Sequence, residues 1–331
     1  MLGELKMVNR ANIFLVLLAI CLTLGGCRLK PDDRDPSAEP EAPPLPEAIR
    51  QEGRREPIIK VYMHEADTVE EMGIEEYICG VVAAEMDPQW PEEALAAQAI
   101  IARSFTLQKI GDEGGVPEHG AHASTDIEEF QAYSAERIND RVRKAVNKTK
   151  GQVAVYRNEF IRGWFHAFAG PRTALAGEGL DFKEGNPPYI QIVESPGKEI
   201  VPKEEGYWSA SFSAEKVRAA VEEVSGSDPG PIVDFEISEK GPSGRATRFK
   251  INGVEVSAPS LRLALGSTEM RSTYIEDLAV QGDQITLSGV GYGHGVGMCQ
   301  WGARALAEDN WSARDIVKYF YRDIEIVQAW S

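Results

Sequence analysis

The chain has 331 residues, of which 43% are hydrophobic, and this is enough apolar material for one large core or two. Its formal net charge of −17 argues against a nucleic-acid-binding protein and against a polybasic membrane-surface binder, because both depend on a surplus of lysine and arginine. An acidic chain suits a neutral or cationic substrate, although solubility alone accounts for the same charge.

The first residues have the layout of a secretory signal. Lys6 and Arg10 precede an apolar run that ends at Leu24, and this run is shorter than the roughly 20 apolar residues of a transmembrane helix. The run continues into Gly25-Gly26-Cys27, which looks like a bacterial lipobox. Residues 1–27 are therefore predicted to be a lipoprotein signal peptide with Cys27 as the lipidated residue, and an uncleaved anchor is the alternative. Both place the folded part outside the cytoplasm, on the outer face of the cell membrane.

Residues 28–56 hold six prolines among many charges and have almost nothing to bury, so they are predicted to be a disordered tether. Residues 57–331 are expected to fold. Once the signal is removed and Cys27 is lipidated, only Cys79 and Cys299 remain. They are either buried free thiols or one disulfide, and the sequence alone does not decide between these states.

The first half of the folded region mixes strands and helices. A strand is expected at 58–63, and a helix at 75–85, where apolar residues recur at helical spacing. A second helix runs from Glu92 to about Lys109 and is rich in alanine. Because small side chains let neighbouring elements approach closely, this helix is expected at the centre of the fold.

The remaining elements follow without strict alternation, which predicts an α+β fold with strands and helices around a groove. Ser213 and Ser312 are expected to cap helices, and Asn252-Gly253 is a strong hairpin signal. Residues 225–231 form a candidate subdomain boundary. The expected strands lie at 152–156, 160–165, 189–193, 232–237 and 246–256. One expected helix contains Ile138, Val142 and Ala145 and closes at Gly151, and the others lie at 213–224 and 312–321.

Glycine occupies every second position from Gly289 to Gly297. In an extended segment this places five glycines on one face, against which another backbone, a helix or a flat ligand can lie. The opposite face projects Tyr292 and His294. The alternative is a tightly packed core strand in which His294 is bonded to a backbone carbonyl.

Glu85 follows an apolar helical face and precedes a break bounded by Pro88 and Pro91. A carboxyl group among apolar neighbours is desolvated, which raises its pKa and suits it to donate a proton. A solvated glutamate at the end of a helix is the alternative.

Two segments of the chain resemble the signature of the stage II sporulation protein D family. The first is Glu76–Met86 with Pro91–Arg103, and the second is Gly291–Ala303. Shorter pieces between them follow in the family's order, namely Phe165-His166, Asn186 to Tyr189, Ser195-Pro196 and Leu265 to Thr268. The resemblance covers roughly Pro57 to Val327.

That resemblance implies a peptidoglycan lytic transglycosylase acting in sporulation and engulfment. Such an enzyme cleaves glycan strands between N-acetylmuramic acid and N-acetylglucosamine and leaves a 1,6-anhydro sugar. The family's catalytic glutamate falls on Glu85. One carboxyl group suffices for this chemistry, unlike the pair used by ordinary glycosidases. The family also includes enhancers of cell-wall amidases.

The groove implied by the resemblance holds glycan. Its expected lining is Arg103, His166, Tyr189, Tyr292, His294 and Gln300, with an ion pair as the alternative role of Arg103. The expected partners are glycan strands, a cell-wall amidase, and the membrane through the N-terminal lipid or anchor, but not nucleic acid.

The run Ala167-Phe168-Ala169-Gly170 departs from the family, which often has serines and glycines after the histidine. This difference motivates a second hypothesis, a non-catalytic glycan-binding module that stimulates an amidase. Some relatives hold zinc with cysteines near that histidine, but this chain has none between Cys79 and Cys299, so no metal or cofactor is expected there. A third hypothesis is a metal-dependent hydrolase built on His119 and His122.

Overall fold

The structure is a computed structural model that describes residues 41–331, so Cys27 and the predicted signal lie outside the described part. The described residues form an α+β fold with two separate hydrophobic cores. Within residues 41–331, none of the helices combines the length and the apolar character needed to cross a membrane.

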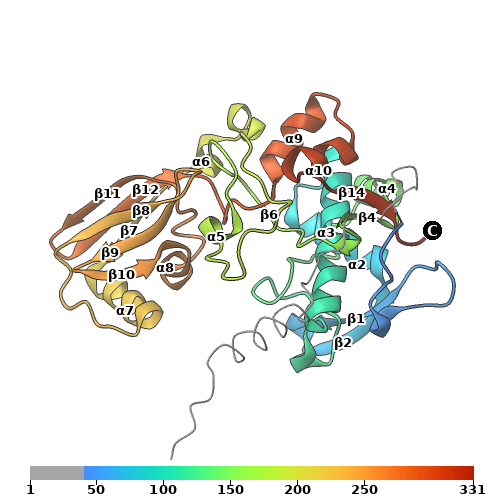
Figure 1. Cartoon of the computed structure of the whole chain (residues 1–331), viewed down its shortest axis with the longest axis horizontal. Coiled ribbons are helices and arrows are strands. Elements are labelled where there is room, and N and C mark those ends of the chain that lie inside the picture. Colours follow the sequence, from blue (N-terminus) through green and yellow to red (C-terminus); the bar gives the residue numbers. More distant parts are fainter. Residues whose placement is uncertain (1–40) are drawn as a thin grey trace, which may run out of the picture. The chain divides into compact units, whose positions relative to one another are not determined.

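The first core draws on both ends of the described chain, which Figure 1 shows as blue and teal elements beside red ones. Its principal elements are β1 (Ile58–Met63), β2 (Thr68–Gly73), α2 (Ile74–Glu85), α3 (Glu92–Glu113), β3 (Ala123–Ser124), α4 (Asp140–Lys148), β4 (Gln152–Tyr156), β5 (Glu159–Phe160), β6 (Phe165–His166), β13 (Met298–Cys299), α9 (Gln300–Glu308), α10 (Ala313–Phe320) and β14 (Glu325–Gln328).

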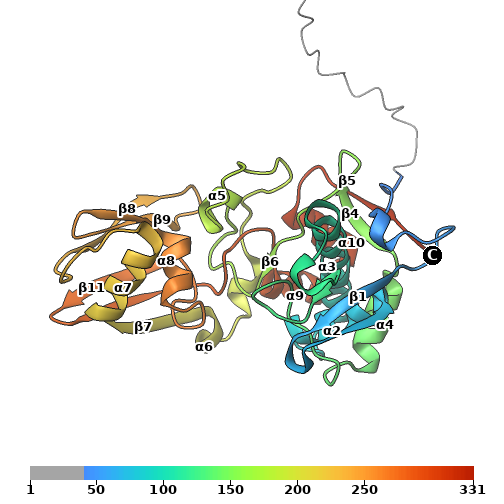
Figure 2. The same cartoon turned by 90° about the horizontal axis from the view of Figure 1, so that it is seen from below.

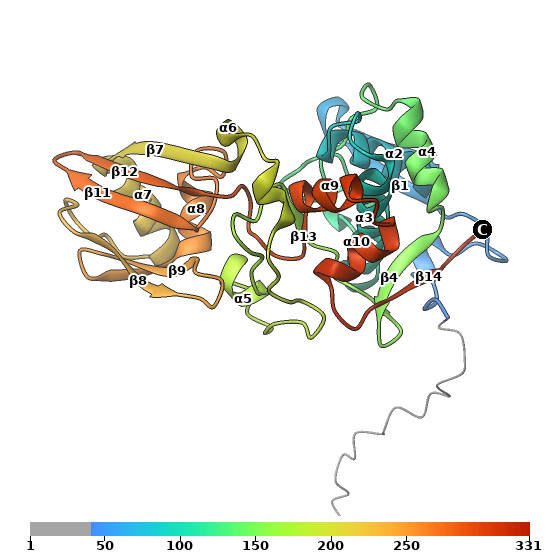
Figure 3. The same ribbon diagram turned by 90° about the horizontal axis from the view of Figure 1, so that it is seen from above.

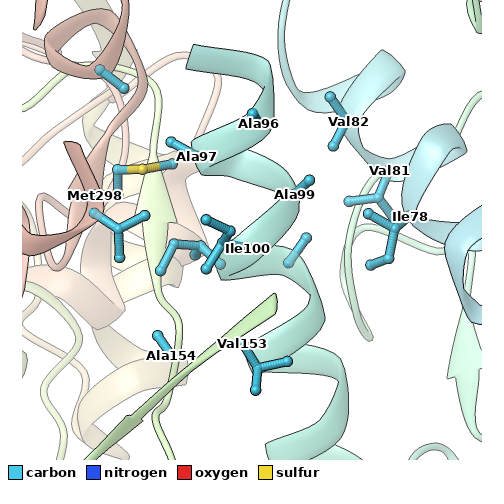
Figure 4. Close-up of a cluster of buried hydrophobic side chains, with 14 of the residues drawn as sticks. Ile78, Val81, Val82, Ala96, Ala97, Ala99, Ile100, Val153, Ala154 and Met298 are labelled. Atoms are coloured by element: carbon cyan, nitrogen blue, oxygen red, sulfur yellow. The ribbon is translucent and has the colours of Figure 1, made fainter. Parts of the chain in front are cut away.

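Helix α3 lies at the centre of this core, as its alanine content predicts. Ala96, Ala97 and Ala99 are fully buried, with α2 on one side of the helix and Met298 on the other (Figure 4). The helix continues beyond the expected end at Lys109, because it stops only where Gly114 adopts a left-handed conformation with φ of 78°.

Short strands surround α3 in three small sheets. Their orders are β2-β1-β3, β14-β4-β5 and β13-β6. The strand expected over 160–165 is wrong, since only its two ends pair. Between them, Gly163 lies against the backbone of α3, where an added Cβ would come within 2.7 Å of the Ile101 carbonyl oxygen. The strand expected at 189–193 is also absent, because these residues pair only through an isolated bridge between Ile190 and Tyr321.

The second core runs from Trp208 to Leu287. Two antiparallel three-stranded sheets, ordered β11-β12-β7 and β10-β9-β8, enclose two helices, which lie between them in Figures 2 and 3. The elements are β7 (Tyr207–Ser213), α7 (Ala214–Ser225), β8 (Phe235–Lys240), β9 (Ala246–Ile251), β10 (Val254–Ser257), α8 (Ala258–Leu265), β11 (Ile275–Gln281) and β12 (Gln284–Val290).

Short-range signals in this region are confirmed. The Ser213 hydroxyl accepts a hydrogen bond from the Lys216 N–H at the start of α7, and Asn252 and Gly253 turn β9 into β10 with positive φ angles. The proposed boundary at 225–231 is wrong, because residues on both sides of this loop pack into the same core.

A buried ion pair ties the first core together. Arg103 is fully buried, and its Nη2 lies 2.7 Å from Oε2 of Glu75. The other oxygen of Glu75 accepts hydrogen bonds from the Gly151 N–H at 2.8 Å and the Trp330 Nε1–H at 2.9 Å. Arg103 also donates to the carbonyl of Val146. The expectation that Arg103 contacts glycan is therefore wrong, and the ion-pair alternative is the one found.

Glu75→Gln keeps the shape of the side chain but leaves the cation of Arg103 buried without a counter-charge. Loss of one partner of such a pair is expected to lower the free energy of unfolding by about 3–5 kcal/mol, measured by urea unfolding of the full chain. Glu76→Gln is the matched control, because its pair with Arg143 is 49% exposed on each side and should contribute about 1 kcal/mol or less. Equal losses in the two variants would contradict the conclusion that the pair of Glu75 and Arg103 ties the first core together.

Candidate active site

Glu85 is the last residue of α2, and its carboxyl group is largely withdrawn from water. Oε1 accepts a hydrogen bond from the Ala132 N–H at 2.9 Å. Burial raises the pKa of Glu85 to about 7, while the Ala132 N–H and the Gln300 side chain act in the opposite direction. Glu85 therefore has the desolvated carboxyl group that its apolar neighbours predict. Near neutral pH the protonated and ionised forms of this group are both populated.

Gln300, the first residue of α9, lies beside this carboxyl. Its side chain is 5% exposed, and its Nε2 makes no hydrogen bond of acceptable geometry within residues 41–331. The next residue, Trp301, packs against Trp90 with ring centroids 4.8 Å apart. The guanidinium of Arg304 lies 4.9 Å from the centroid of the Trp301 ring. Trp90 is not among the predicted site residues, although it lies in the proline-bounded break that follows Glu85.

His166 is brought close to Gln300 by the pairing of β6 with β13. In this parallel pair His166 lies opposite Cys299, and the Trp301 N–H donates to the carbonyl of Ala167 at 3.1 Å. Nδ1 of His166 lies 3.1 Å from the Val296 carbonyl, which can only accept, so Nδ1 carries the proton. Nε2 is then a buried lone pair with no partner in the described chain.

His294 lies next to His166, with the ring centroids 5.5 Å apart. Its Nδ1 accepts a hydrogen bond from the Val296 N–H at 3.0 Å, so the ring is not bonded to a carbonyl through this atom. Burial, helped by the cations of Arg262 and Arg245, lowers the pKa of His294 to about 3. Burial and the neighbouring His294 likewise hold the pKa of His166 well below its usual value. Both rings are neutral at physiological pH and serve as hydrogen-bonding groups.

The segment from Gly291 to Gly297, called the glycine ribbon below, is not the extended strand that was expected. Its alternate glycines have φ angles between 72° and 106°, in the left-handed region that disfavours other residues. The prediction that another backbone can lie against these glycines is confirmed. A Cβ on Gly293 would come within 2.8 Å of the His166 Cβ, and one on Gly297 within 2.0 Å of the Trp164 carbonyl oxygen.

The second core places a cation behind this ribbon. Arg245 is fully buried, and its guanidinium donates to the carbonyls of Arg172, at 2.9 Å, and Ala169. Burial lowers the pKa of Arg245 to about 10, opposed by the nearby carboxyl of Glu178, so the cation persists at neutral pH. Gly295 passes so close that an added Cβ would lie 2.5 Å from the guanidinium carbon.

Tyr189 is not part of this arrangement. It is 8% exposed, its hydroxyl accepts a hydrogen bond from the Arg162 N–H at 2.9 Å, and its ring packs against Tyr156. The expectation that Tyr189 lines the groove is therefore wrong. Tyr292 is partly buried and lies beneath the guanidinium of Arg271, with 5.2 Å to the ring centroid.

The two loop histidines have separate partners. Nε2 of His119 lies 2.9 Å from Oε1 of Glu129, and its ring stacks on Tyr62. Nδ1 of His122 instead accepts from the Lys60 N–H at 3.1 Å. The metal site suggested for His119 and His122 therefore does not form between them.

Cys79 and Cys299 are both free thiols, which decides the question left open by the sequence. Burial raises the pKa of Cys299, and its sulfur accepts from the Gly302 N–H as the N-terminal cap of α9.

Comparisons with known proteins show which families this chain is similar to. A family model described as stage II sporulation protein matches residues 62–156, and a domain of unknown function matches residues 201–297. The chain is 31% identical over 264 residues to an uncharacterised protein of Brachyspira hyodysenteriae, covering 78% of this chain and 68% of that protein. It is 29% identical over 286 residues to stage II sporulation protein D of Bacillus subtilis, covering 82% and 79%. An amidase enhancer of Bacillus subtilis is 27% identical over 286 residues, covering 73% of this chain and 39% of the enhancer.

Gly295→Ala is expected to displace the ribbon, because the new methyl group overlaps the buried guanidinium and the backbone has φ of 83°. The free energy of unfolding should fall by about 3 kcal/mol, a value that combines overpacking with the left-handed penalty. Gly282→Ala is the control, since φ is 64° there but nothing lies within 4 Å, so its loss should stay near 1 kcal/mol. Losses of the same size at both positions would contradict close packing of the ribbon.

Glu85→Gln should stabilise the protein increasingly as the pH rises. The pKa of Glu85 in the folded chain is about 7, above its usual value of 4.5, so its contribution to stability is full below pH 4.5 and is lost as the pH rises through 7. The amide of the variant does not ionise, so the variant does not lose this free energy of unfolding as the pH rises. Between pH 5 and pH 8 the variant should gain about 2 kcal/mol over the unmodified chain in urea unfolding. Asp87→Asn, which alters an exposed carboxyl nearby, should show no comparable gain.

Proposed function

The chain belongs to the stage II sporulation protein D family, and from this premise we propose that it is a peptidoglycan lytic transglycosylase with Glu85 as its acid and base. It cleaves glycan strands between N-acetylmuramic acid and N-acetylglucosamine and leaves a 1,6-anhydro end. The observation that carries this proposal is the carboxyl of Glu85, which is withdrawn from water, has a pKa of about 7 and lies beside Gln300.

One carboxyl group performs both halves of this reaction. Protonated Glu85 gives its proton to the glycosidic oxygen as the bond from that oxygen to C1 of the muramic acid breaks. The carboxylate then takes the proton of the sugar's 6-hydroxyl as this oxygen bonds to C1, so Glu85 ends protonated and no water is consumed. A pKa near 7 suits a group that must both donate and accept a proton near neutral pH.

The surrounding groups can orient an uncharged sugar. The Ala132 N–H engages Oε1 of Glu85, which leaves Oε2 for the substrate. Because Nδ1 of His294 accepts a hydrogen bond, the proton of this neutral ring resides on Nε2, which faces the backbone carbonyl of Phe165 and would exchange that partner for a sugar hydroxyl when glycan binds. Tyr292 and Gln300 complete the lining in this proposal, and His166 supports it with Nε2 as an acceptor.

The proposed location is the outer face of the cell membrane, with a lipid on Cys27 as the anchor and the proline-rich segment after it as the tether. The expectation that this tether extends to residue 56 is wrong, because Ile49 is buried in the first core and Leu45 packs against it. Two relatives are named stage II sporulation protein D, and this supports a role in sporulation. In this proposal the role is the remodelling of peptidoglycan during engulfment.

A second candidate is a non-catalytic glycan-binding module that stimulates a cell-wall amidase. The similarity to an amidase enhancer favours it, and so does the run after His166. There the Ala169 N–H donates to the Cys299 sulfur and the Ala169 carbonyl accepts from Arg245, so this residue serves packing and offers no hydroxyl to a ligand.

Incubation of the full chain with purified glycan strands should release anhydro-ended fragments, identified by mass spectrometry. Glu85→Gln should lower their release by at least about a hundredfold, because the proton donor is lost. Since the donor must start protonated, kcat/KM of the unmodified chain should fall as the pH rises above 7.

Glu76→Gln, which alters an exposed carboxyl on the same helix, is the control and should retain full activity. Exhaustive chelation should also leave the activity unchanged, and loss of activity would contradict a mechanism that rests on the carboxyl of Glu85 alone. Strand binding without anhydro products, together with faster turnover of an added amidase, would replace the enzyme by the second candidate.

A further inference from the structure

A surface cavity of about 430 Å³ lies beside β7, the edge strand of the sheet ordered β11-β12-β7, on the outside of the second core. It is separate from the residues assigned to the active site above. The side chains used in this argument are Tyr207, Ser209, Ser211, Thr268, Glu269 and Arg271.

The wall of this cavity is joined to the start of the glycine ribbon at three places. Tyr207 pairs with Val290 in the ladder of β7 and β12. The Gly291 N–H donates to the Gly206 carbonyl at 2.8 Å, and the Gly293 N–H donates to the Arg271 carbonyl at 2.8 Å. The guanidinium of Arg271 also covers the ring of Tyr292. These backbone contacts fix the cavity beside the start of the ribbon.

The other end of the ribbon reaches the proposed acid. The chain passes from β12 through the ribbon into β13 and α9, whose first residue, Gln300, lies beside Glu85 (Figure 3). Ten residues separate Val290 from Gln300, and a fully extended chain of that length spans at most about 35 Å. Val290, beside the cavity, and Gln300, beside Glu85, therefore lie within about 35 Å of each other, which sets the scale of the span that a glycan strand would bridge.

The lining suits a hydroxyl-rich, uncharged ligand. Tyr207 is 53% exposed although it lies in a strand, so its ring offers an apolar face with a polar tip. Ser209, Ser211 and Thr268 are exposed and add hydroxyl groups. Glu269 is already paired with Lys216 at 2.9 Å, and Arg271 uses one amino group on the Glu204 carbonyl, so neither charge is left wholly free for an ionic ligand.

We propose that this cavity binds a further sugar of the glycan strand that is held at Glu85, with Tyr207 as its stacking platform. The inference rests on the proposed function, and it gives the second core a role in substrate binding. The active site then recognises a stretch of glycan that extends along the ribbon, and long strands bind more tightly than short ones.

The test uses the full chain carrying Glu85→Gln, so that bound strands are not cleaved. The probes are a tetrasaccharide and long strands, both prepared from peptidoglycan without stem peptides, and the dissociation constants are measured by titration. Tyr207→Ala should weaken binding of long strands about fivefold to tenfold and leave that of the tetrasaccharide unchanged. Tyr207→Trp keeps a ring and should retain the affinity. Ser209→Tyr fills the cavity from the same strand and should repeat the loss.

Trp311→Ala is the matched control, since it removes a 39% exposed aromatic ring outside this cavity and should change neither constant. Unchanged binding of long strands by Tyr207→Ala and Ser209→Tyr overturns this inference alone, and so does equal weakening for both probes. A third titration uses long strands that carry stem peptides, and a loss seen only with these also overturns the inference, because the cavity would then bind peptide. If the chain that carries only Glu85→Gln binds no strand of any length, the proposed function is wrong and this inference is wrong with it.

Discussion

The buried pair of Glu75 and Arg103 is the interaction on which the first core depends. Two charges withdrawn from water are tolerated only when nearly every lone pair and proton is satisfied, and here the partners come from distant parts of the chain. Glu75 is in the first turn of α2, so its contacts with Arg103 of α3 and with Trp330 help to set the direction of that helix. Glu85, at the other end of α2, is positioned as a consequence.

The glycine ribbon connects that core to the second one. Its left-handed glycines let the backbone pass close to His166 on one side and to the guanidinium of Arg245 on the other. The buried cations help to keep the two histidines neutral, whereas the pKa of Glu85 is raised towards neutrality. One group near the site thus titrates close to pH 7, and its neighbours provide uncharged hydrogen bonds, which suits a sugar substrate.

The family comparisons divide the chain in a way that the structure explains. The stage II sporulation match, at 62–156, contains Glu85 and Ala132, whereas the match at 201–297 contains the second core and His294. Gln300 belongs to neither segment, yet it lies beside the carboxyl of Glu85. The candidate site is therefore assembled from both matched segments, from His166 between them and from the residues that follow them.

The sequence by itself determined the features that depend on neighbours along the chain. The alanine-rich helix, the caps at Ser213 and Ser312, the turn at Asn252-Gly253 and the apolar setting of Glu85 are all encoded within a few residues. Only the tertiary structure decided that Arg103 pairs with Glu75 and that Tyr189 packs in the core, because those partners are remote in sequence. The conformation of the glycine ribbon was also decided by the tertiary structure. Glycine tolerates extended and left-handed backbones almost equally, so the packing around the ribbon selects between them.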